Sequence, residues 1–182
     1  MSKNMNTRSK ALGVFDSLIS REKTLTFSVL AVLVLYLPTV ISSQIITGTL
    51  VNMTLILATL LIGPYVAIVL GLMPSGLALL SGLLPLPLAP MIPFIIIGNI
   101  ILIGVYHYLG EKNFIASIFT AAFLKFLFLF STGYILGAML LNSEQASVMI
   151  ASVFGWTQLL TAILGGFSAF LVLSILRKVR RR

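Results

Sequence analysis

Between Lys23 and Glu111 the sequence contains no aspartate, glutamate, lysine or arginine. The whole chain is 59% hydrophobic and 9% charged, whereas about a quarter of the residues of a soluble domain are charged. A small soluble fold buries only part of its apolar surface, so lipid is the solvent that accommodates such a chain. Because a helix needs roughly 20 apolar residues to cross the hydrocarbon core, the chain has room for at most about six spans. The sequence therefore predicts an all-α polytopic membrane protein.

The chain divides into three expected parts. Residues 1–23 are polar and basic and lack the long apolar stretch of a secretory signal. An amphipathic helix on the cytoplasmic face and a frayed tail are both open interpretations of this segment. Residues 24–176 are expected to form one six-helix transmembrane domain for substrate binding, and residues 177–182 a basic cytoplasmic tail.

Glycines, prolines and short polar runs divide the apolar segment into expected spans. The spans are predicted at residues 24–43, 51–63, 65–84, 91–109, 114–141 and 146–176, with connections at 44–49, 85–90, 110–113 and 142–145. Four prolines between Pro85 and Pro93 exclude regular helix throughout that stretch, and Pro74 is expected to interrupt the third span.

The distribution of basic residues predicts the orientation. With six spans and both termini in the cytoplasm, every lysine and arginine except Lys125 is cytoplasmic, and the outer loops contain none. We therefore expect a multi-pass protein of the cell's inner or plasma membrane. The net charge of +8 then reflects topology and contact with anionic lipid, and we expect no nucleic-acid partner.

The positions of the acids disfavour several classes of function. Asp16, Glu22, Glu111 and Glu144 all lie in expected tails or loops, and the chain has no cysteine. Intramembrane metalloenzymes, lipid-phosphate transferases and carboxylate-based proton pumps need acids within the spans. We therefore expect no catalytic residues, no metal site and no cofactor.

Lys125 is the one charged residue inside an expected span, about 17 Å from its cytoplasmic end. A lysine at mid-membrane costs about 2.5–3.5 kcal/mol on insertion scales, and the spans contain no acid to pair with it. Three interpretations are open: it snorkels to the interface, it bonds carbonyls exposed by prolines or glycines, or it meets an anionic ligand in a water-filled cavity. Ser117, Ala121 and Thr132 share its helix face. These small or hydroxylated side chains leave space beside the ammonium, which favours the third interpretation.

Polar residues in other spans are expected near the depth of Lys125. Asn52, Asn99 and Gln158 are either helix-packing amides or, together with Lys125, a polar cluster open to the outside. Trp156 is either a stacking surface for a ligand or a packed side chain. We take all five as candidate substrate-binding residues.

Several stretches are similar to those of the substrate-binding S components of energy-coupling factor (ECF) vitamin transporters. They are Thr47–Asn52, Gly63–Pro64, Pro85–Asn99 and Ala121–Lys125, within a resemblance that extends from about residue 24 to 176. The resemblance implies a subunit that captures a small, vitamin-like molecule, anionic if it meets Lys125, near the extracellular face.

The same resemblance implies two kinds of partner besides the bilayer: a membrane coupling subunit and a pair of cytoplasmic ATPases. The chain contains no Walker A loop, which fits ATP hydrolysis on separate subunits. It departs from the family's Ala-x-x-x-Ala docking motif. The first span offers Ser28 and Ala31, but Leu35 stands four residues after Ala31, where the motif has its second alanine. Its single histidine, His107, also differs from the N-terminal His motif of metal-type S components.

Other functions stay open at this level. A membrane scaffold or assembly protein would pack the polar residues without a cavity. A stand-alone secondary transporter would be favoured by inverted repeats, and an enzyme would need acid–base residues in the spans.

Overall fold

The computed structural model describes residues 21–41, 43–80, 82, 84, 86–140 and 153–180, and within them all regular structure is helical. The elements are α2 (Arg21–Val40), α3 (Gln44–Leu61), α4 (Pro64–Leu80), the short 3-10 helix η1 (Leu86–Met91), α5 (Ile92–Leu109), α6 (Phe114–Leu140) and α8 (Trp156–Arg180). The expectations for residues 1–20, the loop at 142–145, the first residues of the last span at 146–152 and the tail at 181–182 lie outside the described residues.

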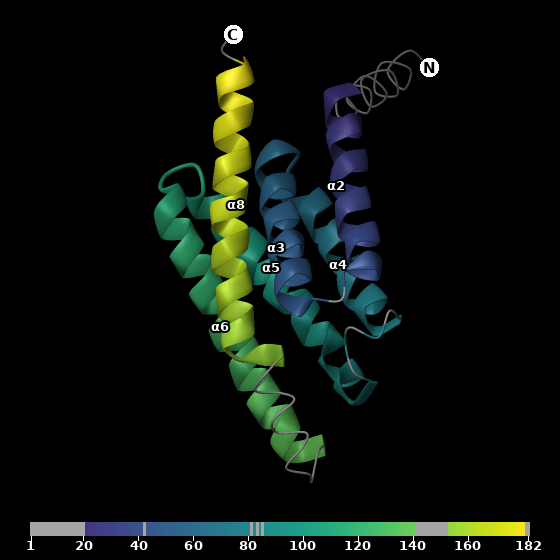
Figure 1. Cartoon of the computed structure of the whole chain (residues 1–182). Helices are drawn as coiled ribbons and strands as arrows, with labels where there is room; N and C mark the ends of the chain where they lie inside the picture. The colour runs from purple at the N-terminus through teal and green to yellow at the C-terminus, as the bar shows by residue number, and fades with distance from the viewer. Residues whose placement is uncertain are drawn as a thin grey trace, which may run out of the picture.

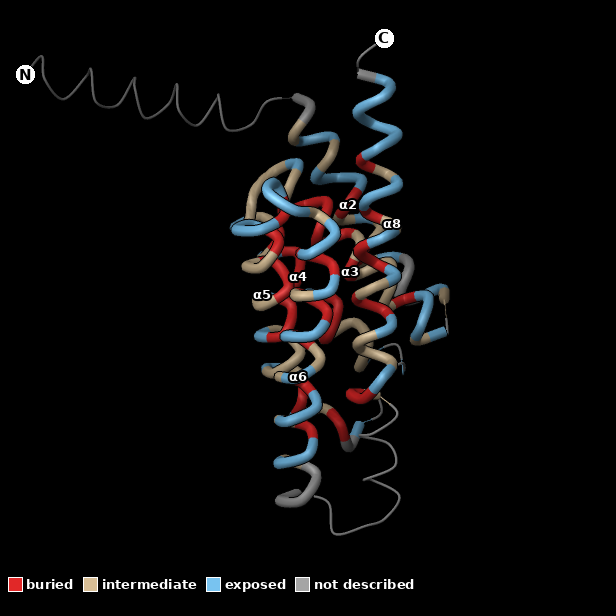
Figure 2. The backbone as a smooth tube through the Cα atoms, turned by 90° about the vertical axis from the view of Figure 1, so that its left-hand side faces the viewer, coloured by how far each residue is buried: buried red, intermediate tan, exposed pale blue. Residues whose placement is uncertain are grey.

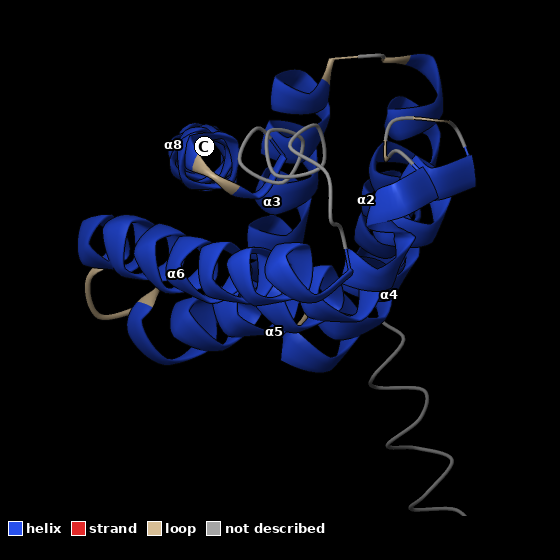
Figure 3. Cartoon of the chain, turned by 90° about the horizontal axis from the view of Figure 1, so that it is seen from below, coloured by secondary structure: helices blue, strands red, loops and turns tan. Residues whose placement is uncertain are grey.

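The α-helices form two rows of three. Seen along the bundle, α8, α3 and α2 make one row, and α6, α5 and α4 make the other (Figure 3). Helix α3 is central, because it contacts α2, α4, α5 and α8. The start of α2, the turn between α5 and α6, and the end of α8 lie at the same end of the bundle (Figure 1), which we call the terminal end.

Four of the described stretches are long and apolar enough to cross a membrane: Gln44–Leu61, Leu88–Leu109, Phe114–Leu136 and Trp156–Val179. Helices α2 and α4 contain the shorter apolar stretches Lys23–Tyr36 and Pro64–Leu80. The all-α membrane fold is therefore supported, and the count of six spans and the orientation stay predictions.

The expected loop at residues 44–49 is wrong, because α3 begins at Gln44. Gly48 suggested a turn, but in the structure it lies inside the helix against α8. A Cβ atom added at Gly48 would lie 3.1 Å from Cγ2 of Thr161. The glycine therefore permits a close helix contact, as small residues do between membrane helices.

A proline marks the start of α4, whereas the proline inside the helix does not end it. Gly63 has a φ of +142°, which favours glycine, and Pro64 opens the helix as expected. Pro74 does not interrupt α4, which continues to Leu80. Membrane helices tolerate such a proline where neighbouring groups satisfy the freed backbone. Leu86–Met91 forms a 3-10 helix, in agreement with the expected irregular stretch.

Apolar buried residues among those described form two clusters on either side of a polar layer. In Figure 2 the buried stretches of the tube gather in the middle of the bundle. The larger cluster, called the dry core, includes Leu55, Leu70, Leu102, Tyr106 and Leu173. The smaller, called the second cluster, consists of Leu84, Leu88, Met91, Leu129 and Phe154. Because lipid is as apolar as these side chains, close packing holds the helices together more than burial does.

Helices α3 and α8 pack closely against each other at Gly165. A Cβ atom at this position would lie 2.7 Å from Cβ of Asn52 and 3.0 Å from the backbone nitrogen of Met53. The neighbours are therefore main chain or directly attached to it. This contact fixes the position of Asn52 relative to α8.

Candidate functional site: a buried lysine beside a cavity

The charges of the described residues are separated along the bundle. Arg21 and Lys23 lie in the first turn of α2, Lys112 in the turn between α5 and α6, and Arg177 and Lys178 near the end of α8, all at the terminal end (Figure 1). The described acids, Glu22 and Glu111, lie at the same end. Lys125, midway along α6, is the exception and is 3% exposed.

The ammonium of Lys125 is held by two side-chain amides. Its Nζ donates to Oδ1 of Asn52 over 2.6 Å and to Oδ1 of Asn99 over 2.8 Å. Asn52 and Asn99 are 1% and 2% exposed, so all three groups are removed from lipid. A lysine ammonium has three N–H donors. The described part of the chain supplies acceptors for two of them.

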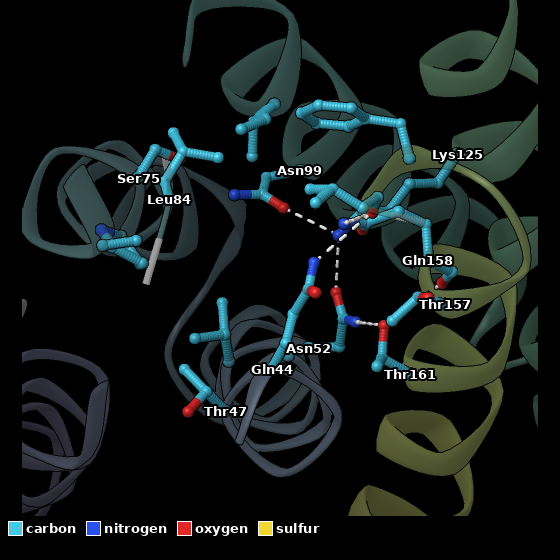
Figure 4. Close-up of a pocket in the computed structure, with 17 residues that line it drawn as sticks. Gln44, Thr47, Asn52, Ser75, Leu84, Asn99, Lys125, Thr157, Gln158 and Thr161 are labelled. Carbon is cyan, nitrogen blue, oxygen red and sulfur yellow. Dashed lines mark hydrogen bonds between the residues drawn. The ribbon is translucent and has the colours of Figure 1, made fainter. Parts of the chain in front are cut away.

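Each asparagine is oriented by a second hydrogen bond. Nδ2 of Asn52 donates to Oγ1 of Thr161 on α8 over 3.4 Å, and Nδ2 of Asn99 donates to the carbonyl of Gly71 on α4 over 3.2 Å. Both NH₂ groups therefore point away from the lysine, and both oxygens point toward it (Figure 4). The network joins α3, α4, α5, α6 and α8 around one cation.

Two of the three interpretations of Lys125 do not fit this geometry. The buried ammonium does not reach the interface, as snorkelling requires. Its acceptors are side-chain amides, so main-chain carbonyls do not cap it. The remaining interpretation is that the ammonium of Lys125 faces an internal space.

That space is a cavity of about 110 Å³ between Lys125 and the end of the bundle opposite the termini. It extends from Lys125, midway along α6, to Gln44 at the start of α3 and Leu84 before η1. The described residues that line it are Gln44, Thr47, Gly48, Val51, Asn52, Pro74, Ser75, Ala78, Leu84, Ile95, Asn99, Lys125, Val153, Phe154, Thr157, Gln158 and Thr161. Lys125 is the one charged residue among them.

Gln158 lies on the α8 side of the cavity, as the sequence suggested. Its Nε2 donates to the carbonyl of Val153 over 3.1 Å. Gln44 was assigned to an outer loop, but it also lines the cavity, and its Nε2 lies 3.5 Å from the same carbonyl. The two amides therefore meet at the junction between the start of α3 and the start of α8.

Ser75 is a polar lining residue that sequence reasoning missed. It is 4% exposed, and its Oγ has no hydrogen-bond partner among the described residues. Thr49, Thr54 and Tyr106 also carry such oxygens, but of the four only Ser75 lines the cavity. The available signal was a hydroxyl beside Pro74 inside an otherwise apolar helix.

Trp156 is not brought to this site. Its side chain is 76% exposed and stacks on Phe126, with ring centroids 5.8 Å apart and an interplanar angle of 24°. It borders a separate apolar groove with Ile45 and Ile163. Of the five candidate residues, the structure therefore gathers Asn52, Asn99, Lys125 and Gln158, and their role in binding stays a prediction.

Comparison of the chain with protein-family models, with curated proteins and with solved structures found no match. The resemblance to ECF S components therefore rests on the residues of this sequence alone. The geometry of the cavity is the independent argument for function.

Proposed function

We propose that this chain is the substrate-binding subunit of an ECF-type importer, which captures a small anionic, vitamin-like molecule in the cavity beside Lys125. One observation carries the proposal: a buried ammonium faces a cavity and has no acidic partner among the described residues that line it. Burying an unpaired charge is costly. An anionic ligand would supply the missing negative charge.

The neutral amides are consistent with a site that is completed by its ligand. Asn52 and Asn99 stabilise and orient the ammonium without neutralising it. An aspartate in either place would cancel the charge and compete with an anion. The arrangement therefore keeps one positive charge and one N–H donor for the ligand.

The orientation follows from the basic terminal end. Basic residues are enriched on the cytoplasmic side of membrane proteins, and the cavity lies toward the opposite end of the bundle. In this orientation the ligand enters from the extracellular side. A coupling subunit and two ATPases would then supply the energy for its release into the cell.

The binding step is tested by pairing each anion with its neutral isostere. The purified chain in lipid nanodiscs is titrated with carboxylate vitamins and with the corresponding amides. We expect at least one acid to bind, and to bind about 100-fold more weakly to Lys125→Met, since a lost charge-assisted hydrogen bond and its charge account for about 2–3 kcal/mol. Lys112→Met, in the exposed turn at the other end of the bundle, is the matched control and should bind like the wild type.

Lys125→Arg separates charge from folding. It keeps the positive charge, so it should retain the preference for acid over amide even if the larger head lowers the affinity. Equal binding of every acid to the wild type and to Lys125→Met would refute the site.

The coupling step has its own test. In proteoliposomes, ATP-dependent uptake of the ligand should require co-reconstitution with a coupling subunit and its ATPases. Uptake by the chain alone, driven by an ion gradient, would instead identify a secondary transporter.

A further inference from the structure

The cavity has a second point of contact for a ligand, at Ser75. Ser75 lines the same cavity as Lys125, and its buried hydroxyl oxygen has no hydrogen-bond partner among the described residues. A buried hydroxyl without a hydrogen bond is costly. Figure 4 draws the residues that line the cavity, and in this view Asn99 lies between Ser75 and Lys125.

The position of Ser75 relative to the lysine follows from helix geometry. Asn99 is hydrogen-bonded both to Lys125 and to the carbonyl of Gly71, so Gly71 lies at about the same depth in the bundle as the ammonium of Lys125. Ser75 lies four residues later on α4, about 6 Å further along the helix axis. Since α4 runs away from the terminal end, Ser75 lies further from that end than Gly71 does.

The charge of the cavity limits the ligand to a single negative charge. Lys125 is the one basic residue among the described lining residues, and it has one N–H without an acceptor. A phosphate monoester has a charge near −2 and three oxygens that demand donors. The amide NH₂ groups of Asn52 and Asn99 each donate one hydrogen bond away from Lys125, to Thr161 and to the Gly71 carbonyl, and neither amide adds a second positive charge.

The volume limits the size. The cavity of about 110 Å³ has room for several water-sized groups, because roughly 10–15 Å³ is enough to hold one water, so it favours a small ligand. We therefore infer that the ligand is a compact monocarboxylate whose carboxylate meets Lys125 and whose second polar group, several bonds away, meets Ser75. This inference rests on the proposed function and narrows its ligand from any small anion to this class.

The test uses acids that differ by one hydroxyl. Benzoate and 3-hydroxybenzoate form one pair, hexanoate and 6-hydroxyhexanoate a flexible second pair, and phenyl phosphate is the dianionic probe. Affinities are measured by calorimetry on the full chain in nanodiscs. In at least one pair we expect the hydroxylated acid to bind about fivefold more tightly than its parent, the gain from one buried hydrogen bond. Phenyl phosphate should bind at least tenfold more weakly than benzoate.

Substitution of Ser75 assigns the gain to that residue. In Ser75→Ala the hydroxylated acid should fall to the affinity of its parent, while the parent is unchanged. Ser75→Thr should keep part of the gain. Ser174→Ala is the matched control, because Ser174 bonds a carbonyl of its own helix at an exposed position on α8. If Ser75→Ala does not fold, the comparison of paired acids on the wild type still tests whether the cavity binds a second polar group of the ligand.

The failures of the two proposals are distinguishable. If the hydroxyl gives no gain in either pair, or if Ser75→Ala weakens both members of a pair equally, the contact with Ser75 is refuted. If phenyl phosphate binds best and Lys125→Met abolishes its binding, the monocarboxylate class is refuted and the anion site stands. If no anion binds in a manner that depends on Lys125, both proposals are refuted.

Discussion

The two halves of the bundle differ in how the space between their helices is filled. Toward the terminal end, the dry core fills the space between helices with apolar side chains, and Tyr106 packs its ring on Phe114. Toward the other end, polar and apolar side chains together line a cavity, Lys125 is hydrogen-bonded to two amides beside it, and the smaller apolar cluster lies next to it. A membrane bundle gains nothing in packing from an internal space, and the ligand that we propose would fill it.

The contrast predicts that an added methyl group is tolerated only where the structure leaves room. Gly165→Ala places a Cβ atom 2.7 Å from Cβ of Asn52 and 3.0 Å from backbone atoms of α3, so the helices must separate. We expect the free energy of unfolding to fall by about 3 kcal/mol, measured by denaturant titration in mixed micelles.

Gly104→Ala is the matched control, because a Cβ atom at Gly104 meets nothing within 4 Å. Its expected effect is a gain of up to about 1 kcal/mol from helix propensity. Equal stability of the two variants would show that the α3–α8 contact is looser than described.

The cavity half should behave as a coupled unit. Asn99→Leu removes one acceptor of Lys125 and the partner of the Gly71 carbonyl, and it should lower the free energy of unfolding by about 1–3 kcal/mol. Once Lys125→Met has removed the ammonium, the same change should cost less.

A double-mutant cycle with Asn99→Leu and Lys125→Met measures this coupling, which we expect to be about 1–2 kcal/mol. Strict additivity of the two effects would mean that the amide and the ammonium do not interact. It would contradict the account of the cavity half as a coupled polar network.

The smallest effect is expected at Tyr106, whose buried hydroxyl has no partner among the described residues. Tyr106→Phe keeps the ring and removes the oxygen, so we expect stability to be unchanged or to rise by about 1 kcal/mol. Ligand affinity should be unaffected, whereas Ser75→Ala, which removes a similar hydroxyl from the cavity half, should change the affinity for hydroxylated acids. A loss of affinity in Tyr106→Phe would mean that the two halves are not independent.

The membrane fold could be predicted from the sequence because its physical cause is compositional. Long uncharged runs and the prolines around Gly63–Pro64 and residues 85–93 located most helices within a few residues. The start of α3 was missed because Gly48 serves helix packing rather than a turn. A single sequence does not distinguish these two uses of glycine.

The site was predictable in part. Lys125, Asn52, Asn99 and Gln158 stand out because polar groups in lipid need partners. Gln44 and Ser75 did not stand out, because one was placed in a loop and the other carries a small side chain beside a proline. Trp156 was included for its chemistry, but its direction around α8 depends on packing that composition does not reveal.

The central claim is that Lys125 holds an anion in the cavity, and native mass spectrometry tests it most directly. The wild type, Lys112→Met and Lys125→Met are each incubated with a cellular small-molecule extract and released intact from nanodiscs. The account predicts one small acidic adduct on the first two proteins and none on Lys125→Met. The same adduct on all three proteins, or no adduct on the wild type, would contradict it.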